Sequence, residues 1–220
     1  MTVEQALLNR RSIRGFLDEK VPEPLIARIF GLAQLAPSNC NVQPWTTHVV
    51  SGEALARMRQ ALTEVASRNE PPTPDIELTP PYRGIYRERQ VEAARALFSA
   101  TGVERGDLEA RSSSMLRNFQ FFDAPHAAFI FLPSDAGWRE ALDVGIYVQS
   151  LMLLMTENGL ASCAQGALSH YAATVRQVLE ISDEFRLIVG MSFGLEDVDH
   201  SANGVRTNRA PIASNHVFHL

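Results

Sequence analysis

The chain has 220 residues, of which 45% are hydrophobic and 20% are charged, and its formal net charge is −5 at pH 7. A chain of this length buries enough surface to fold without a disulfide or a metal. The acidic balance argues against a duplex nucleic-acid-binding protein, and the longest apolar run, residues 144–155, is too short to span a bilayer. Cys40 and Cys163 form no paired motif. We therefore expect a cytoplasmic protein that contacts neither nucleic acid nor a membrane.

Helical and strand patterns alternate along the chain. Thr2 and Gln5 form a capping-box pattern at the first helix, and Pro37 and Pro125 each stop a helix. A further strand is expected to end near residues 163–166. This order predicts one domain, residues 1–220, of the α+β or α/β class. The spacing of apolar residues predicts helices over 3–9, 25–35, 53–68, 85–99, 107–121, 138–158 and 172–179, and strands over 46–50, 126–132 and 186–193.

Residues 69–81 differ from their flanks because they contain five prolines and almost no periodic apolar pattern. The flanking segments are too short to be independent domains, so this stretch is interpreted as a loop or lid rather than a linker. Together with the residues up to 89, it is expected to form an excursion over a pocket.

Two polar segments near the N-terminus are candidates for ligand binding. The first, Arg10-Arg11-Ser12-Ile13-Arg14, offers guanidinium groups and a hydroxyl that suit phosphate oxygens. Arg10 and Arg14 would share a face if the preceding helix continued; the alternative is that these cations only offset a helix dipole. The second, residues 37–45 (PSNCNVQPW), holds amide donors between prolines, as the edge of a flat heteroaromatic ring requires. Its alternative is an ordinary polar loop.

Two later segments have similar potential. Residues 159–167 are rich in small side chains that let the backbone approach a ligand closely. Residues 203–211 contain Arg206 and Arg209 in a polar tail, for which a solvated surface is the alternative. The sequence contains no G-x-G-x-x-G motif, no H-E-x-x-H motif and no paired cysteines, so neither a dinucleotide-binding domain nor a metal site is expected.

Residues 190–194 match G-x-S-x-G, the nucleophile elbow of serine hydrolases, with Ser192 as the nucleophile. An elbow must lead into a helix, whereas residues 195–200 have the pattern of a loop. Little chain remains after Gly194 to supply an acid and a histidine. A serine hydrolase is therefore kept only as a weak alternative.

In order, the segments RRS-x-R, PS-x-x-N-x-QPW, GL-x-SC-x-x-G and R-T-x-R-A-P resemble those of the nitroreductase-like FMN-dependent oxidoreductases. The resemblance runs over nearly the whole chain. It implies an α+β fold with a mixed central sheet surrounded by helices. It further implies an interlocked homodimer with two FMN sites at the subunit interface, and a tail, residues 197–220, that reaches the partner subunit with its last residues as a strand.

The same resemblance implies roles for individual residues. Those expected near the FMN phosphate and ring edge are Arg10, Arg11, Ser12, Arg14, Arg206 and Arg209. Ser38, Asn39 and Asn41 would lie by the isoalloxazine from the partner subunit, and Gln165 and Gly166 would approach the flavin N5 side. No side chain is expected to be catalytic, because the flavin carries the chemistry.

The implied activity is two-electron reduction of a nitroaromatic acceptor, including nitrobenzoate-like ones, or of a quinone, with NAD(P)H as donor in a ping-pong sequence. We expect Tyr82, Arg83 and Tyr86 to contact this small aromatic acceptor through stacking and charge; an exposed helix start is the alternative. Other reactions of the family (reductive dehalogenation, ene reduction, flavin cleavage) remain open, as does a flavin-binding protein without turnover.

Overall fold

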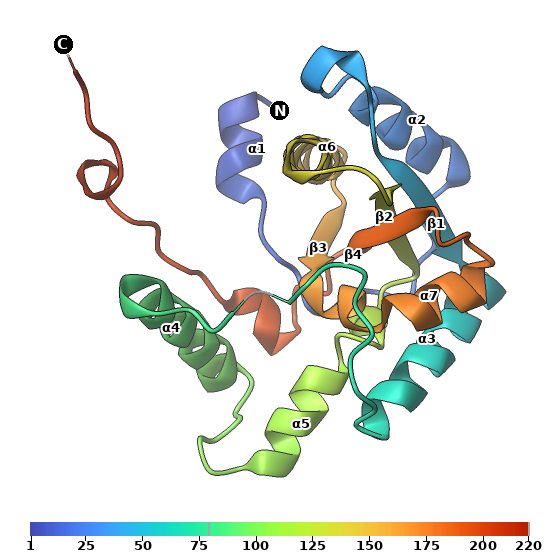
Figure 1. Ribbon diagram of the computed structural model, residues 1–220. Coiled ribbons are helices and arrows are strands. Elements are labelled where there is room, and N and C mark those ends of the chain that lie inside the picture. The colour runs from blue at the N-terminus through green and yellow to red at the C-terminus, as the bar shows by residue number, and fades with distance from the viewer. Residues whose placement is uncertain (79, 220) are drawn as a thin grey trace.

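A four-stranded sheet forms the centre of the computed structural model, which describes residues 1–78 and 80–219 (Figure 1). The strands are β1 (Thr46–Ser51), β2 (His126–Pro133), β3 (Ala161–Gln165) and β4 (Phe185–Gly194), in the order β1-β2-β4-β3. The three neighbouring pairs are antiparallel. The parallel pairing of the expected mixed sheet is supplied at the outer edge of β3, where Ser12 forms an isolated bridge to Ser162.

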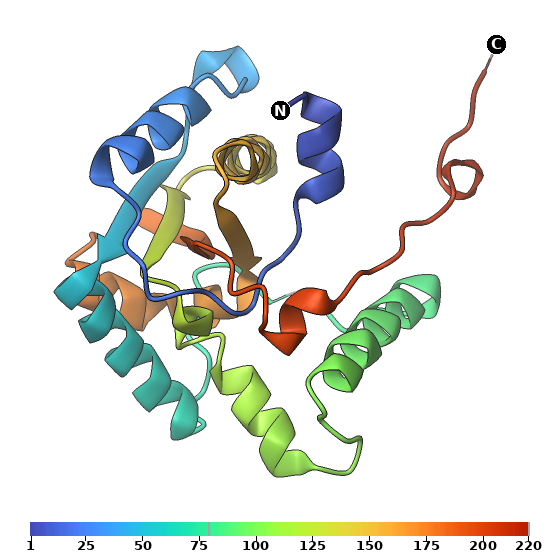
Figure 2. The same cartoon turned by 180° about the vertical axis from the view of Figure 1, so that it is seen from behind.

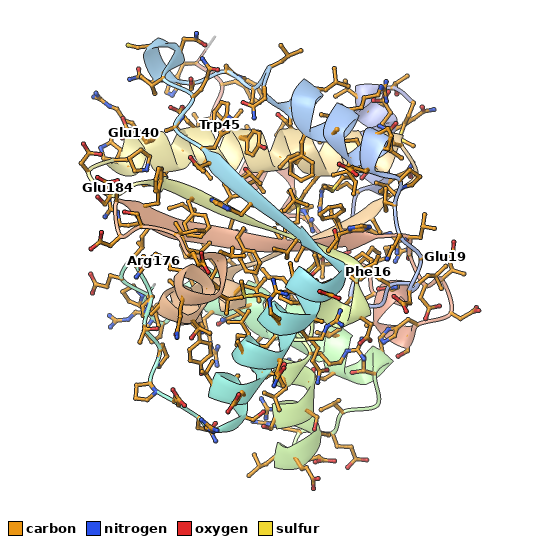
Figure 3. The ribbon with its side chains drawn as sticks, turned by 90° about the vertical axis from the view of Figure 1, so that its right-hand side faces the viewer. Phe16, Glu19, Trp45, Glu140, Arg176 and Glu184 are labelled. Carbon is orange, nitrogen blue, oxygen red and sulfur yellow. The ribbon has the colours of Figure 1, made fainter. Side chains whose placement is uncertain are left out.

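Helices cover both faces of this sheet. They are α1 (Val3–Asn9), α2 (Glu23–Ala33), α3 (Gly52–Ser67), α4 (Gly84–Ala100), α5 (Leu108–Leu116), α6 (Trp138–Glu157) and α7 (Ala172–Leu179). The helices α2 and α6 lie on one face, and α3 and α7 lie on the other (Figures 1 and 3). Within residues 1–78 and 80–219, no helix has the length and apolar character needed to cross a membrane.

The alternation of side chains along β2 divides the core in two. Phe129 and Phe131 pack in the cluster on the α3 and α7 side, whereas Ile130 and Leu132 pack in the cluster on the α6 side. Successive strand residues point to opposite faces, so a strand that is apolar throughout must be covered on both. Figure 3 shows Trp45 on the α6 side, where its ring stacks on Tyr147 with centroids 4.8 Å apart.

Several boundaries differ from the sequence-based predictions. The helix predicted over 107–121 ends at Leu116, and it could not have included Phe121, because Phe121, Phe122 and Asp123 adopt positive φ angles of 59°, 54° and 68°. These angles lie in the left-handed region, which an α-helix cannot continue through, and they turn both Phe side chains into the core. The last described residues, 217–219, form no strand, and Leu220 lies outside the described residues.

The proline-rich stretch is held against the body of the protein over its first half. Thr73 N–H donates to the carbonyl of His170 at 2.7 Å. The Asp75 carboxylate pairs with Arg176 of α7 and accepts from the Leu187 N–H at 2.8 Å. This anchoring confines the predicted excursion to residues 76–89, of which Thr79 lies outside the described residues.

Helices α4 and α5 extend away from the sheet and its covering helices (Figures 1 and 2). Neither helix contains a buried residue. The tail from residue 205 also leaves the body of the protein and ends far from it (Figure 2). These two projecting parts contrast with the closed layers around the sheet.

Candidate functional site

The segment Arg10–Arg14 runs along the free edge of β3 in an extended conformation. Helix α1 ends at Asn9, and Arg10 has φ −60° and ψ 124°. Ile13 N–H donates to the Ser162 carbonyl at 3.1 Å, and the Ile13 side chain is buried. Arg10 and Arg14 therefore do not share a helix face as the sequence suggested. They share a face with Ser12 because alternate residues of an extended chain point the same way.

The pKa of the Cys163 thiol in β3 reflects this arrangement. Burial raises the pKa above its ordinary value, while the nearby Arg14, a hydrogen bond with Ser12, and Arg10 oppose the rise. The backbone bridge between Ser12 and Ser162 independently places this segment beside β3. Two cations and a hydroxyl are gathered at one edge of the sheet.

Arg11 points to the other side of the segment and has protein partners. Its Nη2 donates to both carboxylate oxygens of Glu196 at 2.9 Å, and its Nη1 donates to the carbonyl of Asn203 at 2.6 Å. These bonds engage both terminal nitrogens of the guanidinium group, one with a carboxylate and the other with a carbonyl. The contacts therefore support a structural role for Arg11 rather than the phosphate contact that the sequence suggested.

Asn203 is a residue of the site region that sequence reasoning did not single out. Its side chain is buried, and its Oδ1 accepts from the Arg14 N–H at 2.8 Å. Its Nδ2 donates to the carbonyls of Gly15 and Asp197, each at 2.8 Å. One amide thus ties the Arg14 backbone to the start of the tail. These contacts join residues almost 190 positions apart, so no local pattern could reveal them.

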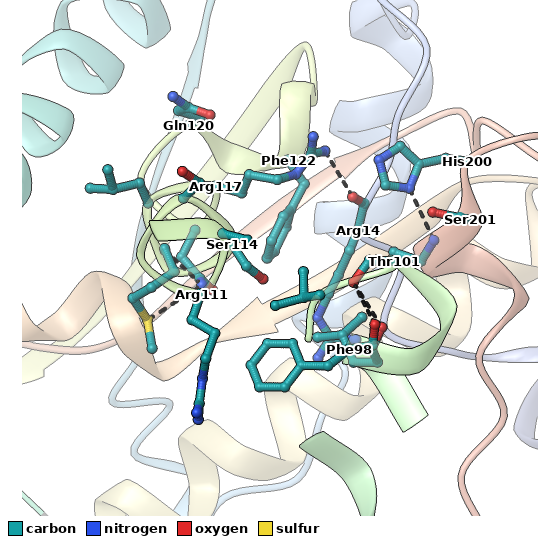
Figure 4. Close-up of a pocket in the computed structure, with 18 residues that line it drawn as sticks. Arg14, Phe98, Thr101, Arg111, Ser114, Arg117, Gln120, Phe122, His200 and Ser201 are labelled. Atoms are coloured by element: carbon teal, nitrogen blue, oxygen red, sulfur yellow. Dashed lines mark hydrogen bonds between the residues drawn. The ribbon is translucent and has the colours of Figure 1, made fainter. Parts of the chain in front are cut away.

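A cavity of about 590 Å³ opens beside this segment (Figure 4). Arg14, Phe122 and Arg117 line it, and the cavity continues between α4 and α5. The Arg14 guanidinium lies 6.0 Å from the centre of the Phe122 ring. Arg117 donates to the Arg14 carbonyl at 3.1 Å and pairs with Asp123. Arg14 is therefore the cation of the predicted set that faces this cavity with no carboxylate partner among the described residues.

Gln165 ends β3 and Gly166 follows it, and Gln165 contacts Asn118, which lines this cavity. The Gln165 side chain is buried, donates to the carbonyl of Asn118 at 2.9 Å and accepts from the Ser192 hydroxyl. Gly166 is exposed, and a Cβ added there would meet no atom within 4 Å. A ligand can therefore approach the backbone at this turn, while the Gln165 amide is already engaged. Asn118, another residue that sequence reasoning missed, both lines the cavity and fixes Gln165.

The weak serine-hydrolase alternative does not agree with the structure. Ser192 lies within β4, opposite Cys163 and Ala127, and its exposed fraction is 0%. A nucleophile elbow needs an exposed hydroxyl on a sharp turn into a helix. Gly190 is explained by packing instead, because a Cβ there would lie 2.3 Å from the Leu168 side chain.

Ser38, Asn39 and Asn41 form a rigid turn elsewhere on the molecule. Asn39 N–H donates to the Asp143 carboxylate at 3.0 Å, and the Ser38 hydroxyl accepts from the Gln43 N–H at 2.9 Å. The side chains of Asn39 and Asn41 are exposed. This turn and α1 lie on opposite sides of α6 (Figures 1 and 2). The chain therefore does not bring these residues to its own Arg14 cavity.

The remaining predicted residues are exposed. Arg206 and Arg209 donate mainly to backbone carbonyls of the tail itself, and neither has a carboxylate within ion-pair distance among residues 1–78 and 80–219. Tyr82, Arg83 and Tyr86 lie at the start of α4 and do not line the Arg14 cavity. Their side chains are available to another molecule.

Comparison with known proteins identifies the family. The nitroreductase NfnB of Mycolicibacterium smegmatis is 40% identical over 215 residues, which cover 96% of this chain and 89% of that protein. The 4-nitrobenzoate reductase of Pseudomonas putida is 30% identical over 206 residues, covering 94% and 90%. The crystal structure of the FMN-dependent nitroreductase NfnB from Mycobacterium smegmatis in complex with NADPH superposes with a TM-score of 0.95 at 37% identity, covering 99% of this chain and 98% of that one. The family model of the nitroreductase family matches residues 7–195, and the chain belongs to that family.

Proposed function

We propose that this protein is an FMN-dependent oxidoreductase that reduces nitroaromatic or quinone-type acceptors with NADPH or NADH. The observation that carries the proposal is the pair Arg10 and Arg14 at the edge of β3, which have no carboxylate partner among residues 1–78 and 80–219 and lie at or beside a cavity of about 590 Å³. Relatives that cover nearly the whole chain include a 4-nitrobenzoate reductase and an FMN-dependent nitroreductase solved with NADPH.

The residues present fit FMN. A phosphomonoester carries nearly two negative charges at neutral pH, and guanidinium groups bind such oxygens in a forked geometry. Arg10, Ser12 and Arg14 share one face of an extended segment. Arg206 lies near Arg11 and Ile13 on the other side of that segment, and Arg209 follows it in the tail. The open backbone at Gly166 suits the close approach of a flat ring. Bound FMN would supply the hydride chemistry, with the nicotinamide and the acceptor visiting in turn.

We propose a homodimer because each chain holds only part of the expected site. The turn with Ser38, Asn39 and Asn41 lies across α6 from its own α1, so a second copy would be needed to bring it to the cavity. The projecting tail fits the same arrangement. Large apolar side chains of α1, α6 and the tail are also exposed, namely Val3, Leu7, Leu8, Leu142, Val217 and Phe218.

We also propose that the acceptor is held by Tyr82, Arg83 and Tyr86. Tyr82 is 50% exposed and Tyr86 is 64% exposed, so both rings can stack on an aromatic ligand. Arg83 has no ion pair among the described residues and could pair with an acceptor carboxylate. A cytoplasmic location is part of this proposal, since free thiols such as Cys40 and Cys163 are usual in a reducing compartment.

The proposal is tested by the visible absorption spectrum of the purified protein, followed by release and identification of any chromophore. We expect FMN at about one per chain, and NADPH oxidation when 4-nitrobenzoate or nitrobenzene is added. A colourless protein that fails to bind added FMN would contradict the proposal. Bound FMN without oxidation by any nitroaromatic or quinone would favour a flavin-binding protein, whereas turnover with halogenated or alkene acceptors alone would favour another reaction of the family.

The acceptor site has its own test. Arg83→Ala should raise KM for 4-nitrobenzoate roughly tenfold, the loss of one charged hydrogen bond, and should leave KM for nitrobenzene nearly unchanged. Arg57→Ala on α3, another exposed arginine, is the matched control. Equal effects of Arg83→Ala on both acceptors would remove Arg83 from the acceptor site.

A further inference from the structure

A second cavity, of about 660 Å³, lies between α4 and α5 and is lined by four arginines. We name it the arginine groove and define it by Arg87, Arg95, Arg105, Arg111 and Phe98. We propose that the arginine groove binds the 2′-phosphate-bearing adenosine end of NADPH and makes the enzyme prefer NADPH to NADH. The inference rests on the proposed function, which it extends to the choice of electron donor.

The four arginines come from three consecutive parts of the chain, namely α4, the connection that follows it and α5. Arg87 and Arg95 are eight positions apart on α4 and lie on one helix face with Phe98. Arg105 belongs to the connection between the two helices, and Arg111 belongs to α5. Helical spacing alone can bring together only Arg87 and Arg95, which belong to the same helix. The convergence of all four requires that the two helices and their connection fold together around the groove.

None of the four arginines of the groove forms an ion pair within the described part of the chain. The hydrogen bonds of Arg87 and Arg111 go to uncharged acceptors, the side-chain oxygen of Gln90 at 2.6 Å and the carbonyl of Arg105 at 3.2 Å. Like charges gathered in this way repel one another. An anion in the groove would relieve that repulsion and gain charged hydrogen bonds.

An aromatic ring accompanies the cations. The Arg111 guanidinium lies 5.3 Å from the centre of the Phe98 ring, and the two side chains lie next to each other in Figure 4. Stacking on Phe or on a guanidinium plane is a common way to hold a nucleobase. The groove therefore offers a flat surface for adenine together with donors for phosphate oxygens.

The arginine groove lies beside the Arg14 cavity. Phe98, Val103 and Arg111 line both spaces. An elongated ligand that passes these three side chains would place one end in the cavity where electron transfer is proposed and the other among the arginines. NADPH has this form, with a nicotinamide at one end and a phosphorylated adenosine at the other. A nitrobenzoate is shorter and carries one negative charge, so it accounts less well for four cations.

Binding is tested first without turnover. Calorimetry should show that the FMN-loaded protein binds 2′,5′-ADP at least tenfold more tightly than 5′-AMP, because only the former carries the 2′-phosphate. Arg95→Gln combined with Arg105→Gln should remove most of this difference, since both residues line the groove and not the Arg14 cavity. Arg57→Gln on α3 should bind 2′,5′-ADP as the unmodified protein does.

The kinetic test uses the same variants with one acceptor. In the Arg95→Gln, Arg105→Gln variant, kcat/KM for NADPH should fall at least tenfold, while kcat/KM for NADH changes less than about threefold. An equal fall for both donors, or 2′,5′-ADP binding no tighter than 5′-AMP, would overturn the proposal even if nitroaromatic reduction is observed. If 2′,5′-ADP binding depends on the arginines but no acceptor is reduced, the proposed function fails and the groove assignment stands.

Discussion

Strand β2 and the α4–α5 pair are opposite extremes of one chain. Residues 126–132 of β2 are all buried, with exposed fractions of 3% or less, whereas α4 and α5 contain no buried residue. In the sheet, the buried Gln165 side chain has Ser192 and Asn118 as partners. The arginines of the projecting pair have no acidic partner among the described residues. The contrast separates groups that stabilise the fold from groups left available to a ligand or a second chain.

The largest expected effect comes from removing a side chain in the sheet. Phe129 has an exposed fraction of 0%, so Phe129→Ala should lower the free energy of unfolding by about 3–5 kcal/mol through lost burial and a cavity. Ile85 of α4 is 50% exposed, and Ile85→Ala should change it by about 0.5 kcal/mol or less in the monomer. Urea unfolding monitored by circular dichroism measures both.

Repeating the unfolding measurements at several protein concentrations tests whether α4 contacts a second copy. If α4 packs against a second copy, Ile85→Ala becomes more destabilising as concentration rises, because association contributes to the stability of a dimer. Phe129→Ala should be nearly independent of concentration. A cost of several kcal/mol for Ile85→Ala in a dilute monomer would show that α4 is not the loosely packed region described above.

The features that could be predicted from the sequence are those set by neighbouring residues. The capping box of Thr2 and Gln5 is present as predicted, and the apolar run at 126–132 predicted a buried strand because alternation is absent only when both faces are covered. Helix α6 was predicted within one residue of its end at Glu157. In each case, the residues that determine the element lie close together in the sequence.

The candidate site was less predictable because long-range contacts decide it. Arg11 and Arg14 are equivalent in the sequence motif, yet Glu196 and Asn203 engage the first and leave the second facing a cavity. Asn118 and the arginines around Phe98 had no motif to mark them. The positive φ angles at 121–123 turn the chain where helical spacing predicted continuation, and that turn helps to shape the cavity.

The two arginines provide the second, intermediate prediction. Arg11→Ala should lower the free energy of unfolding by roughly 1.5–3 kcal/mol, because it removes charged hydrogen bonds and leaves Glu196 unpaired. Arg14→Ala should cost no more than about 1 kcal/mol, its contact with Phe122 being a cation–π interaction. Arg14→Ala should, however, weaken FMN binding at least tenfold.

Urea unfolding of the FMN-free protein and titration of FMN fluorescence separate the two effects. The pattern expected is a stability defect without a binding defect for Arg11→Ala, and the reverse for Arg14→Ala. If the Arg11→Ala protein is folded and binds FMN as weakly as Arg14→Ala does, Arg11 contacts the phosphate after all.

The smallest expected effect is a pH dependence that originates beside the sheet. His126 is buried, its Nε2 accepts from the Val21 N–H at 2.9 Å, and its Nδ1 lies beside the Ser51 hydroxyl. A nitrogen that accepts cannot carry a proton, so this geometry requires the neutral ring with its hydrogen on Nδ1. Burial, and then the charge of Lys20, lower the pKa of His126 below its ordinary value of 6.5.

Stability should therefore fall on acidification. The unfolded chain takes up the proton near the ordinary pKa, before the folded chain does, so the contribution of His126 is complete above about pH 6.5 and is lost as the pH falls through the folded pKa. One group contributes a slope of at most about 1.4 kcal/mol per pH unit. Burial also lowers the pKa of His48, which acts in the same direction. The test measures the urea midpoint of unfolding between about pH 8 and pH 5. The midpoint should depend less on pH in His126→Gln than in the unmodified protein, and His48→Gln should remove a separate part of the dependence. A His126→Gln variant with the full original slope would show that the neutral ring beside Val21 is not what ties the fold to pH.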